Sequence, residues 1–310
     1  MTFRITSHRQ LELQRLHAQS HASRSATLQN QISSGVRVHR PSDDPIAQQT
    51  ILSQQRVLNR LEVQHNAIQH ARASLTQSNE QLLDANQLVV QAKALALQGR
   101  QSQTSFELQS LADEVNGFLE TLETVANAKF DGKYLFSGTS TTKAPYSGIV
   151  DGPTQYHGSS STGVVVLSGD DDLDVYLSGD EAFQFVDPES NELTDIFAVI
   201  RQVRDDLQRA ADGDLEEAGR SLDSTIHSLE IGSEHLLSVV GRQSVVLQQL
   251  DRVEERTEEL QFQAETVLSD LRSTDVASAV VALQEEQNLL QFTFATTTRL
   301  LDTSILNFLS

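Results

Sequence analysis

Residues 276–308 read VASAVVALQEEQNLLQFTFATTTRLLDTSILNF and contain neither Pro nor Gly. Apolar residues recur there at spacings of four and three, which is typical of a helix that presents one apolar stripe to a partner. A helix of this length spans about 50 Å at roughly 1.5 Å per residue. Its own hydrogen bonds offset only part of the entropy lost on folding, so we expect it to need a partner. The predicted stripe is Val276, Val280, Leu283, Leu290, Phe294, Leu301 and Phe308.

The predicted partner is a helix over residues 8–36, which repeats the pattern more weakly. Its stripe is Leu11, Ala18, Ala22, Ala26, Ile32 and Val36. The several Ala residues would let two helices approach closely. Gly35 and the run Arg40–Pro45 end this helix, and Pro45 suits the first turn of the next one, where Ser42, Asp43 or Asp44 can cap the free amides.

A longer helix is predicted over residues 45–98, because apolar residues recur every seven positions, the spacing of a coiled coil. The first seam position holds Leu61, Ile68, Leu75, Leu82, Val89 and Ala96, and the second holds Ala71, Ala85 and Ala92. We expect Gly99 to end this helix. Thr104 and Glu107 have the spacing of a capping box for a third helix, which extends to Val125.

The period changes at Lys129. Asp131-Gly132 followed by alternating apolar residues predicts a β-hairpin at 130–138. Residues 138–191 contain Gly, Ser, Thr and Asp between short β-forming runs, which predicts a small β-rich insertion. Helical periodicity returns over residues 193–207 and 215–271, and Ser273, Thr274 or Asp275 can cap the last helix.

We therefore predict a mainly α fold with a small β-rich insertion, in which long coiled-coil-like helices pair the two ends of the chain. Residues 1–43 and 274–310 form a terminal coiled-coil domain. Residues 44–137 and 192–273 form a helical rod domain that carries the hairpin. Residues 138–191 form an exposed β-rich domain.

Composition excludes several classes of protein. The 310 residues include no Cys, so disulfides and thiolate metal sites are excluded. The net charge of −20 argues against nucleic acid as a partner. The chain has no run of 18 apolar residues and no apolar segment near its start, so we expect neither a membrane span nor a signal peptide. Eight Arg in residues 1–60 are compatible with a transit peptide, but a solvated helix face explains them better.

We predict no catalytic, cofactor or metal site. His17 and His21 are four residues apart, but no third ligand accompanies them locally. A second candidate matches ligand positions of a calcium loop, although it has Val175 where the loop needs Gly and lacks flanking helices. That candidate comprises Asp170, Asp172, Asp174, Ser178 and Glu181. A strand with an acidic outer face explains it better. The chain has no phosphate-binding loop or nucleophile elbow, so we expect that it is not an enzyme.

Three segments resemble a known family. Residues 30–38, NQISSGVRV, followed by RPSDDP at 40–45, resemble the amino-terminal signature of bacterial flagellins and flagellin-like proteins. GKYLFSGT at 132–139 is similar to the hairpin of hook-associated members of that family, and residues 275–309 resemble its carboxy-terminal helix. Together the similarity covers about the first 140 and the last 40 residues.

The resemblance implies a structural subunit of the bacterial flagellum that joins hook to filament. The filament subunit, flagellin, is the alternative. It also implies type III export without a cleavable signal peptide, an extracellular location, a homo-oligomeric ring, contacts with hook-associated protein 1 and flagellin, and an export chaperone. Assembly would use the terminal helices through Leu11 and Ile32 together with the stripe at 276–308. A secreted enzyme with helical arms and a coiled-coil sensor are the rivals from other classes; the first lacks a catalytic constellation and the second a membrane span. Whether the β-rich insertion binds an external ligand stays open.

Overall fold

The computed structural model describes residues 2–102, 104–161, 164–166, 172–174, 177–187 and 192–309. Side chains are described from residue 9 to residue 301, except within 162–176 and 188–191 and at 103. The helices are α1 (Thr2–Ser34), α2 (Pro45–Gln101), α3 (Ser105–Ala126), α4 (Gly179–Phe183), α5 (Ile196–Ala211), α6 (Leu215–Arg272) and α7 (Val276–Leu309). The strands are β1 (Lys129–Phe130), β2 (Lys133–Tyr134), β3 (Tyr146–Ser147), β4 (Gln155–Tyr156), β5 (Val164–Val166), β6 (Asp172–Asp174), β7 (Gln184–Val186) and β8 (Leu193–Asp195).

This architecture confirms the predicted mainly α fold, with long helices and only small strand pairs. The chain divides into two compact units, Met1–Leu61 with Glu259–Ser310 and Glu62–Glu258, called unit 1 and unit 2 below. The predicted division into three domains stays a prediction. No helix in the described part of the chain is long and apolar enough to cross a membrane.

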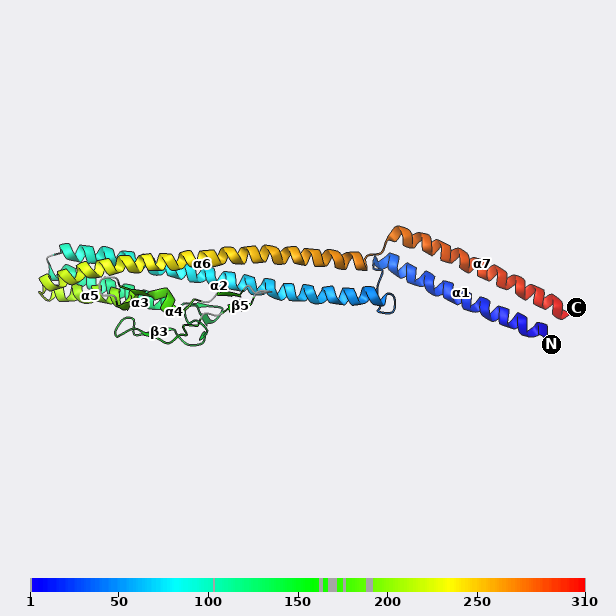
Figure 1. Ribbon diagram of the computed structural model, residues 1–310, viewed down its shortest axis with the longest axis horizontal. Helices are drawn as coiled ribbons and strands as arrows, with labels where there is room; N and C mark the ends of the chain where they lie inside the picture. The colour runs from blue at the N-terminus through cyan, green and yellow to red at the C-terminus, as the bar shows by residue number, and fades with distance from the viewer. Residues whose placement is uncertain are drawn as a thin grey trace. The chain divides into compact units, whose positions relative to one another are not determined.

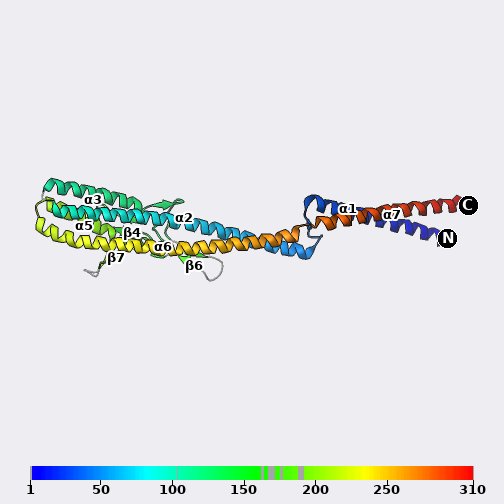
Figure 2. The same ribbon diagram turned by 90° about the horizontal axis from the view of Figure 1, so that it is seen from above.

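Unit 1 contains the pair formed by α1 and α7, which lie side by side in both views (Figures 1 and 2). The two helices run in opposite directions, and an antiparallel bridge joins Val36 to Ser273 where α1 ends and α7 is about to begin. A small apolar cluster next to this bridge contains Val38, Ala47 and Ile51, with Leu268 and Leu271 packed against them.

The heptads predicted for α2 begin at Leu61, the last residue of the Met1–Leu61 part of unit 1, and continue through unit 2. Every predicted seam residue from Leu61 to Ala96 is buried, which confirms both the helix and its register. In this unit the core joins the second half of α2 to α3, α5 and the first half of α6. Ion pairs such as Arg100–Asp223 and Lys93–Glu230 further connect α2 to α6. The result is a helical bundle (Figure 2), and its apolar core is continuous.

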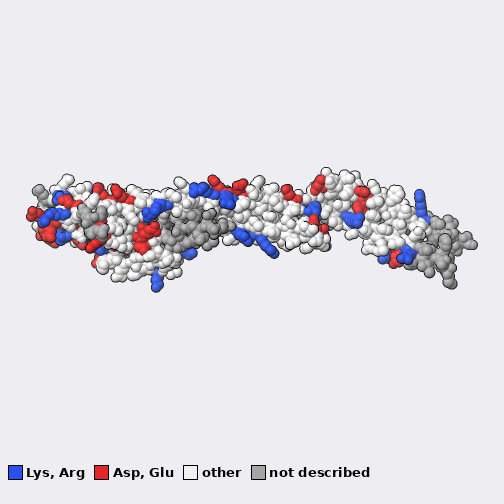
Figure 3. Space-filling model, viewed as in Figure 1, with Lys and Arg blue, Asp and Glu red and all other residues white. Residues whose placement is uncertain are grey.

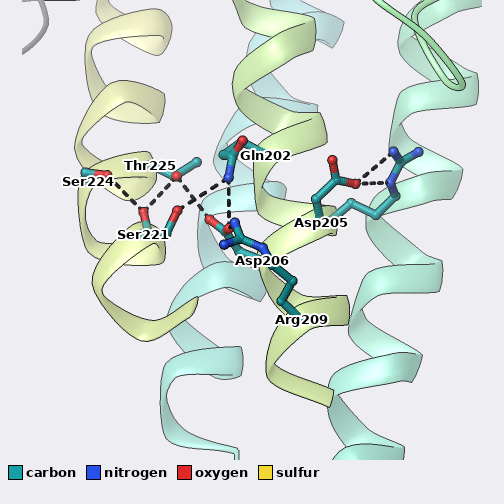
Figure 4. Close-up of polar contacts among 8 residues, drawn as sticks. Gln202, Asp205, Asp206, Arg209, Ser221, Ser224 and Thr225 are labelled. Carbon is teal, nitrogen blue, oxygen red and sulfur yellow. Dashed lines mark hydrogen bonds and ion pairs between the residues drawn. The ribbon is translucent and has the colours of Figure 1, made fainter. Parts of the chain in front are cut away.

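A polar cluster lies between α5 and α6 inside this bundle (Figure 4). The Asp206 side chain is fully buried and accepts hydrogen bonds from Gln202, at 2.8 Å, from Thr225, at 3.4 Å, and from Arg209. Burial raises the pKa of Asp206 despite these donors. The cluster fixes how the two helices pack, because moving either one leaves a buried carboxylate without partners.

The β elements pack on one part of the bundle. β1 and β2 form a hairpin that is shorter than the predicted one at 130–138, with Asp131 and Gly132 at positive φ as a tight two-residue turn requires. β3 pairs with β4, β5 with β6, and β7 with β8, all antiparallel. Arg201 of α5 donates to the backbone oxygen of Ile149 and to Thr154, which ties the insertion to the bundle.

Two predicted helix boundaries and one predicted helix cap were wrong. Gly99 lies inside α2 rather than at its end, and a Cβ there would lie 2.2 Å from Leu207 Cδ2, so Gly permits close packing. Thr104 precedes α3 but its side chain makes no capping hydrogen bond, so the capping box does not form. Leu193 belongs to β8, and Asp195 caps the helix that follows by accepting from the Ala198 amide at 2.6 Å.

Candidate assembly interface

The face of α7 that packs on α1 differs in register from the predicted stripe. Its most buried positions recur every three and four residues. Leu283 and Leu290 of the predicted stripe remain in it, whereas Val280, Phe294 and Leu301 are each replaced by the residue one position nearer the start of the helix. The observed seam is Ala279, Leu283, Glu286, Leu290, Thr293, Thr297 and Leu300.

The face of α1 has the same regular spacing. It comprises Leu11, Gln14, Ala18, His21, Ser25, Leu28 and Ile32. The predicted Ala22 and Ala26 are exposed, and His21 and Ser25 take their places. Both prediction errors have one cause: several seam positions hold small or polar residues, and a search for apolar periodicity passes over them.

A polar contact lies in the middle of this helix pair. His21 Nδ1 lies 2.6 Å from Glu286 Oε2, and Arg24 Nη1 lies 3.5 Å from the other oxygen. The hydrogen bond with His21 lowers the pKa of Glu286. Since both partners of the short contact are mostly buried, sliding one helix along the other would leave them unpaired; the contact therefore specifies the register of the pair.

Large apolar side chains remain outside the pair. On α7, Val281 is 66% exposed, Phe292 is 74% exposed and Phe294 is 57% exposed. At 100° per residue, Val276, Val280, Phe294 and Leu301 border the seam on one side, whereas Val281 and Phe292 lie on the opposite face. Residues 287–298 include no charged side chain. Figure 3 shows large uncharged areas on the described part of these helices. Contiguous exposed apolar surface is a common feature of protein–protein interaction sites.

The segment between α1 and α2 holds the helix pair at one end. Gly35 adopts φ +70 and terminates α1. Its carbonyl accepts from the Thr274 amide at 2.9 Å, and the Arg37 amide donates to the Arg272 carbonyl at 2.6 Å. These backbone hydrogen bonds join the segment that follows α1 to the segment that precedes α7 in one short antiparallel contact.

Asp44 organises the rest of this segment. Its Oδ1 caps α2 by accepting from the Ala47 amide at 3.0 Å, and its Oδ2 accepts from Arg37 Nη1 at 3.0 Å. The Ala47 hydrogen bond, with the Arg37 contact, lowers the pKa of Asp44. Pro45 occupies the first helical position, as predicted. Asp275 caps α7 in the same way, accepting from the amides of Ala277 and Ser278.

The predicted assembly residues fall into two groups. Leu11, Ile32, Leu283 and Leu290 lie half-buried between α1 and α7. Contrary to the predicted stripe, Val276, Val280, Phe294 and Leu301 are exposed. The side chain of Phe308 lies outside the described residues. Sequence reasoning missed Glu286 and Thr293, because neither is apolar.

The two rejected metal candidates can also be placed. His17 is exposed, and His21 contacts Glu286. The calcium-like run lies partly outside the described residues; Asp172 and Asp174 belong to β6, and Glu181 lies 3.4 Å from Arg242. The strand at Asp172–Asp174 agrees with the predicted strand.

Comparison with known proteins gives consistent matches. Residues 6–141 match the bacterial flagellin N-terminal helical region. The chain is 24% identical over 287 residues to flagellar hook-associated protein 3 of Salmonella typhimurium, covering 87% of this chain and 88% of that one. It is 26% identical over 284 residues to flagellar hook-associated protein 3 of Escherichia coli K12, covering 85% and 86%.

Solved structures show the same fold. The flagellar hook-associated protein 3 of Legionella pneumophila matches with a TM-score of 0.64 at 16% identity, over 71% of this chain and 98% of that one. A structure of the flagellar junction protein FlgL from Legionella pneumophila matches with a TM-score of 0.58 at 16% identity, over 72% and 100%. These likenesses, at low identity, concern the fold alone.

Proposed function

We propose that this chain is a member of the bacterial flagellin-like family and a structural subunit of the flagellum that connects the hook to the filament. Both curated relatives carry the name hook-associated protein 3, and they match over more than four-fifths of either chain. The family consists of structural proteins, so the chain is not an enzyme.

The observation that carries this proposal is the apolar surface left on α7 after it packs on α1. Phe294 and Phe292 are largely exposed although the helices are already paired. Exposed large apolar side chains on two faces of one helix favour contacts with further protein. We propose that neighbouring subunits cover them, so that each α1–α7 pair is completed inside a tubular polymer.

The small seam residues make this arrangement workable. Ala279 and Ser25 are buried between the helices and bring little apolar area with them. The pair alone is therefore weakly stabilised, and assembly supplies the missing burial. Weak pairing would keep the ends pliable during type III export and let them order as subunits stack. The proposed neighbours are hook-associated protein 1, flagellin and further copies of this chain in a ring, with an export chaperone before assembly.

A filament subunit is the second candidate, because residues 6–141 match a family description that names flagellin itself. Location separates the two. Antibody against unit 2 should label a single band between hook and filament if the chain is the junction subunit, and the whole filament if it is flagellin.

Deleting the gene gives an independent test. Cells that keep hooks but shed filament subunits into the medium would support a junction subunit. Cells that make normal filaments would refute the proposal, as would normal assembly of a chain that lacks α1 and α7. Complementation with the intact chain is the matched control.

A further inference from the structure

Two helices of unit 2 bring a histidine and two carboxylates together. His65 lies on α2, and Glu254 and Glu258 lie four residues apart on α6. One ring nitrogen of His65 and one oxygen of each carboxylate lie within 4.8 Å of one another. Residues four apart share one face of a helix, so both carboxylates are presented to the facing helix.

His65 has a buried nitrogen that no other group satisfies. The Nδ1 atom is shut off from solvent and has no hydrogen-bond partner among the described residues. Buried ring nitrogens are normally paired, so an unpaired one on a ring that lies next to two carboxylates needs a reason. A cation bound between these three side chains would relieve the electrostatic repulsion of the carboxylates and take up a lone pair of the ring.

Neighbouring side chains position the carboxylates and set the charge. Glu254 accepts hydrogen bonds from Gln69 and, at 3.1 Å, from Arg72. Arg72 also lies 3.3 Å from Asp251. Arg72 therefore supplies one positive charge against the three carboxylates of Asp251, Glu254 and Glu258. These four side chains together carry an excess of two negative charges. Outer hydrogen bonds of this kind hold metal-binding carboxylates in place.

We propose that His65, Glu254 and Glu258 bind a divalent transition-metal ion, with Zn²⁺ the best fit, and that the ion links α2 to α6. One imidazole with two carboxylates is a ligand set that zinc accepts, with water completing the shell. Calcium would need six to eight oxygen ligands, which three side chains including an imidazole do not supply. Tetrahedral zinc places ligand atoms about 3.3 Å apart, and the exposed Glu258 side chain is free to close that difference.

The ion would strengthen a thinly packed part of the helix pair. The apolar cluster beside the site contains only Ile68, Ala71, Leu75 and Leu250 as buried residues. Polar side chains such as Thr257 and Ser74 are also buried along this stretch. A metal link between the two helices therefore adds stability where apolar burial is small. This inference is independent of the proposed role in the flagellum.

The test is isothermal titration of ZnCl₂ into the full-length chain, produced without a histidine tag and stripped with a chelator. We expect one equivalent of zinc to bind. His65→Gln and Glu258→Gln should each weaken binding at least tenfold, since even outer-shell changes cost that much. Glu258→Gln is the safer variant for folding because Glu258 is exposed. Far-ultraviolet circular dichroism confirms that each variant is folded.

His21→Gln is the matched control, because His21 also contacts one carboxylate. It should bind zinc as the unaltered chain does. The proposal is overturned if no zinc binds, if the affinity survives both site substitutions, or if it is lost in His21→Gln instead. Equal binding of Mg²⁺ or Ca²⁺ would also overturn it, because this site is built for a softer ion.

Discussion

Replacing Phe294 with Ala should weaken assembly much more than folding. A Phe side chain buries about 200 Å² when fully covered. Phe294 is 57% exposed next to its partner helix, so a neighbouring subunit can cover roughly 115 Å² of it. At about 25 cal/mol per Å² that area is worth about 3 kcal/mol. Since Ala keeps part of the contact, we expect a loss of about 2–3 kcal/mol, or roughly 30- to 150-fold in the concentration needed for assembly.

The assay measures the lowest concentration at which purified subunits polymerise or cap isolated hooks, with unfolding followed separately by denaturant titration. Phe106→Ala is the matched control, because Phe106 is 84% exposed on α3 of unit 2. Assembly of Phe294→Ala at the concentration of the unaltered chain would refute the assembly role of this face. An equal defect in Phe106→Ala would show that the effect is not specific to α7.

Three further predictions concern folding and pH. Leu82→Ala should lower the free energy of unfolding, measured by urea titration, by about 2–5 kcal/mol because the Leu82 side chain is fully buried. The neighbouring Leu83 is exposed, so Leu83→Ala should change the free energy of unfolding by under about 0.5 kcal/mol. The hydrogen bond with His21 lowers the pKa of Glu286, so the stability that Glu286 gives the α1–α7 pair is fully present above the ordinary pKa of Glu and is lost as the pH falls through the lowered pKa. Amide exchange of α7 should become faster over that fall in pH. Glu286→Gln should abolish this pH dependence. Burial raises the pKa of Asp206, so the free energy of unfolding of the unaltered chain should rise relative to that of Asp206→Asn as the pH falls from 7 to about 4. A difference in unfolding free energy between the two chains that does not change with pH would contradict this reasoning.

The sequence predicts α2 almost completely, because both positions of its seam hold apolar residues for several heptads. Leu61 and Ala96 mark the ends of this run, and all of its predicted members are buried. The Asp131-Gly132 turn was equally readable, since two residues at positive φ in a short hairpin favour this dipeptide. Here local pattern and packing agree.

The terminal pair was only half predictable. Thr293 takes a seam position that the apolar pattern gave to Phe294, and the pattern passed over Glu286, so the pairing partner was right and the register partly wrong. An apolar residue that faces another subunit and one that faces the same chain look alike in a sequence. Val280 and Phe294 are such residues, and only the structure separates them.

The proposed metal site could not be found from the sequence at all. His65 is far from Glu254 in the chain, and neither residue stands in a recognisable motif. Only the antiparallel pairing of α2 and α6 brings them together. The structure also revises Gly99: a glycine that looked like a helix end serves instead to admit Leu207.

The separation of α1 from α7 along the chain fixes an order of events during synthesis. Unit 2 is continuous in sequence, so it can fold as soon as it leaves the ribosome. α1 is made before all of unit 2 and must wait for α7, which is made after it. Contacts this distant in the chain form slowly. Although α1 is made before unit 2, its pairing with α7 is thus among the last steps of folding. A newly made subunit therefore exposes the apolar faces of both helices, which a partner can bind before α1 and α7 pair.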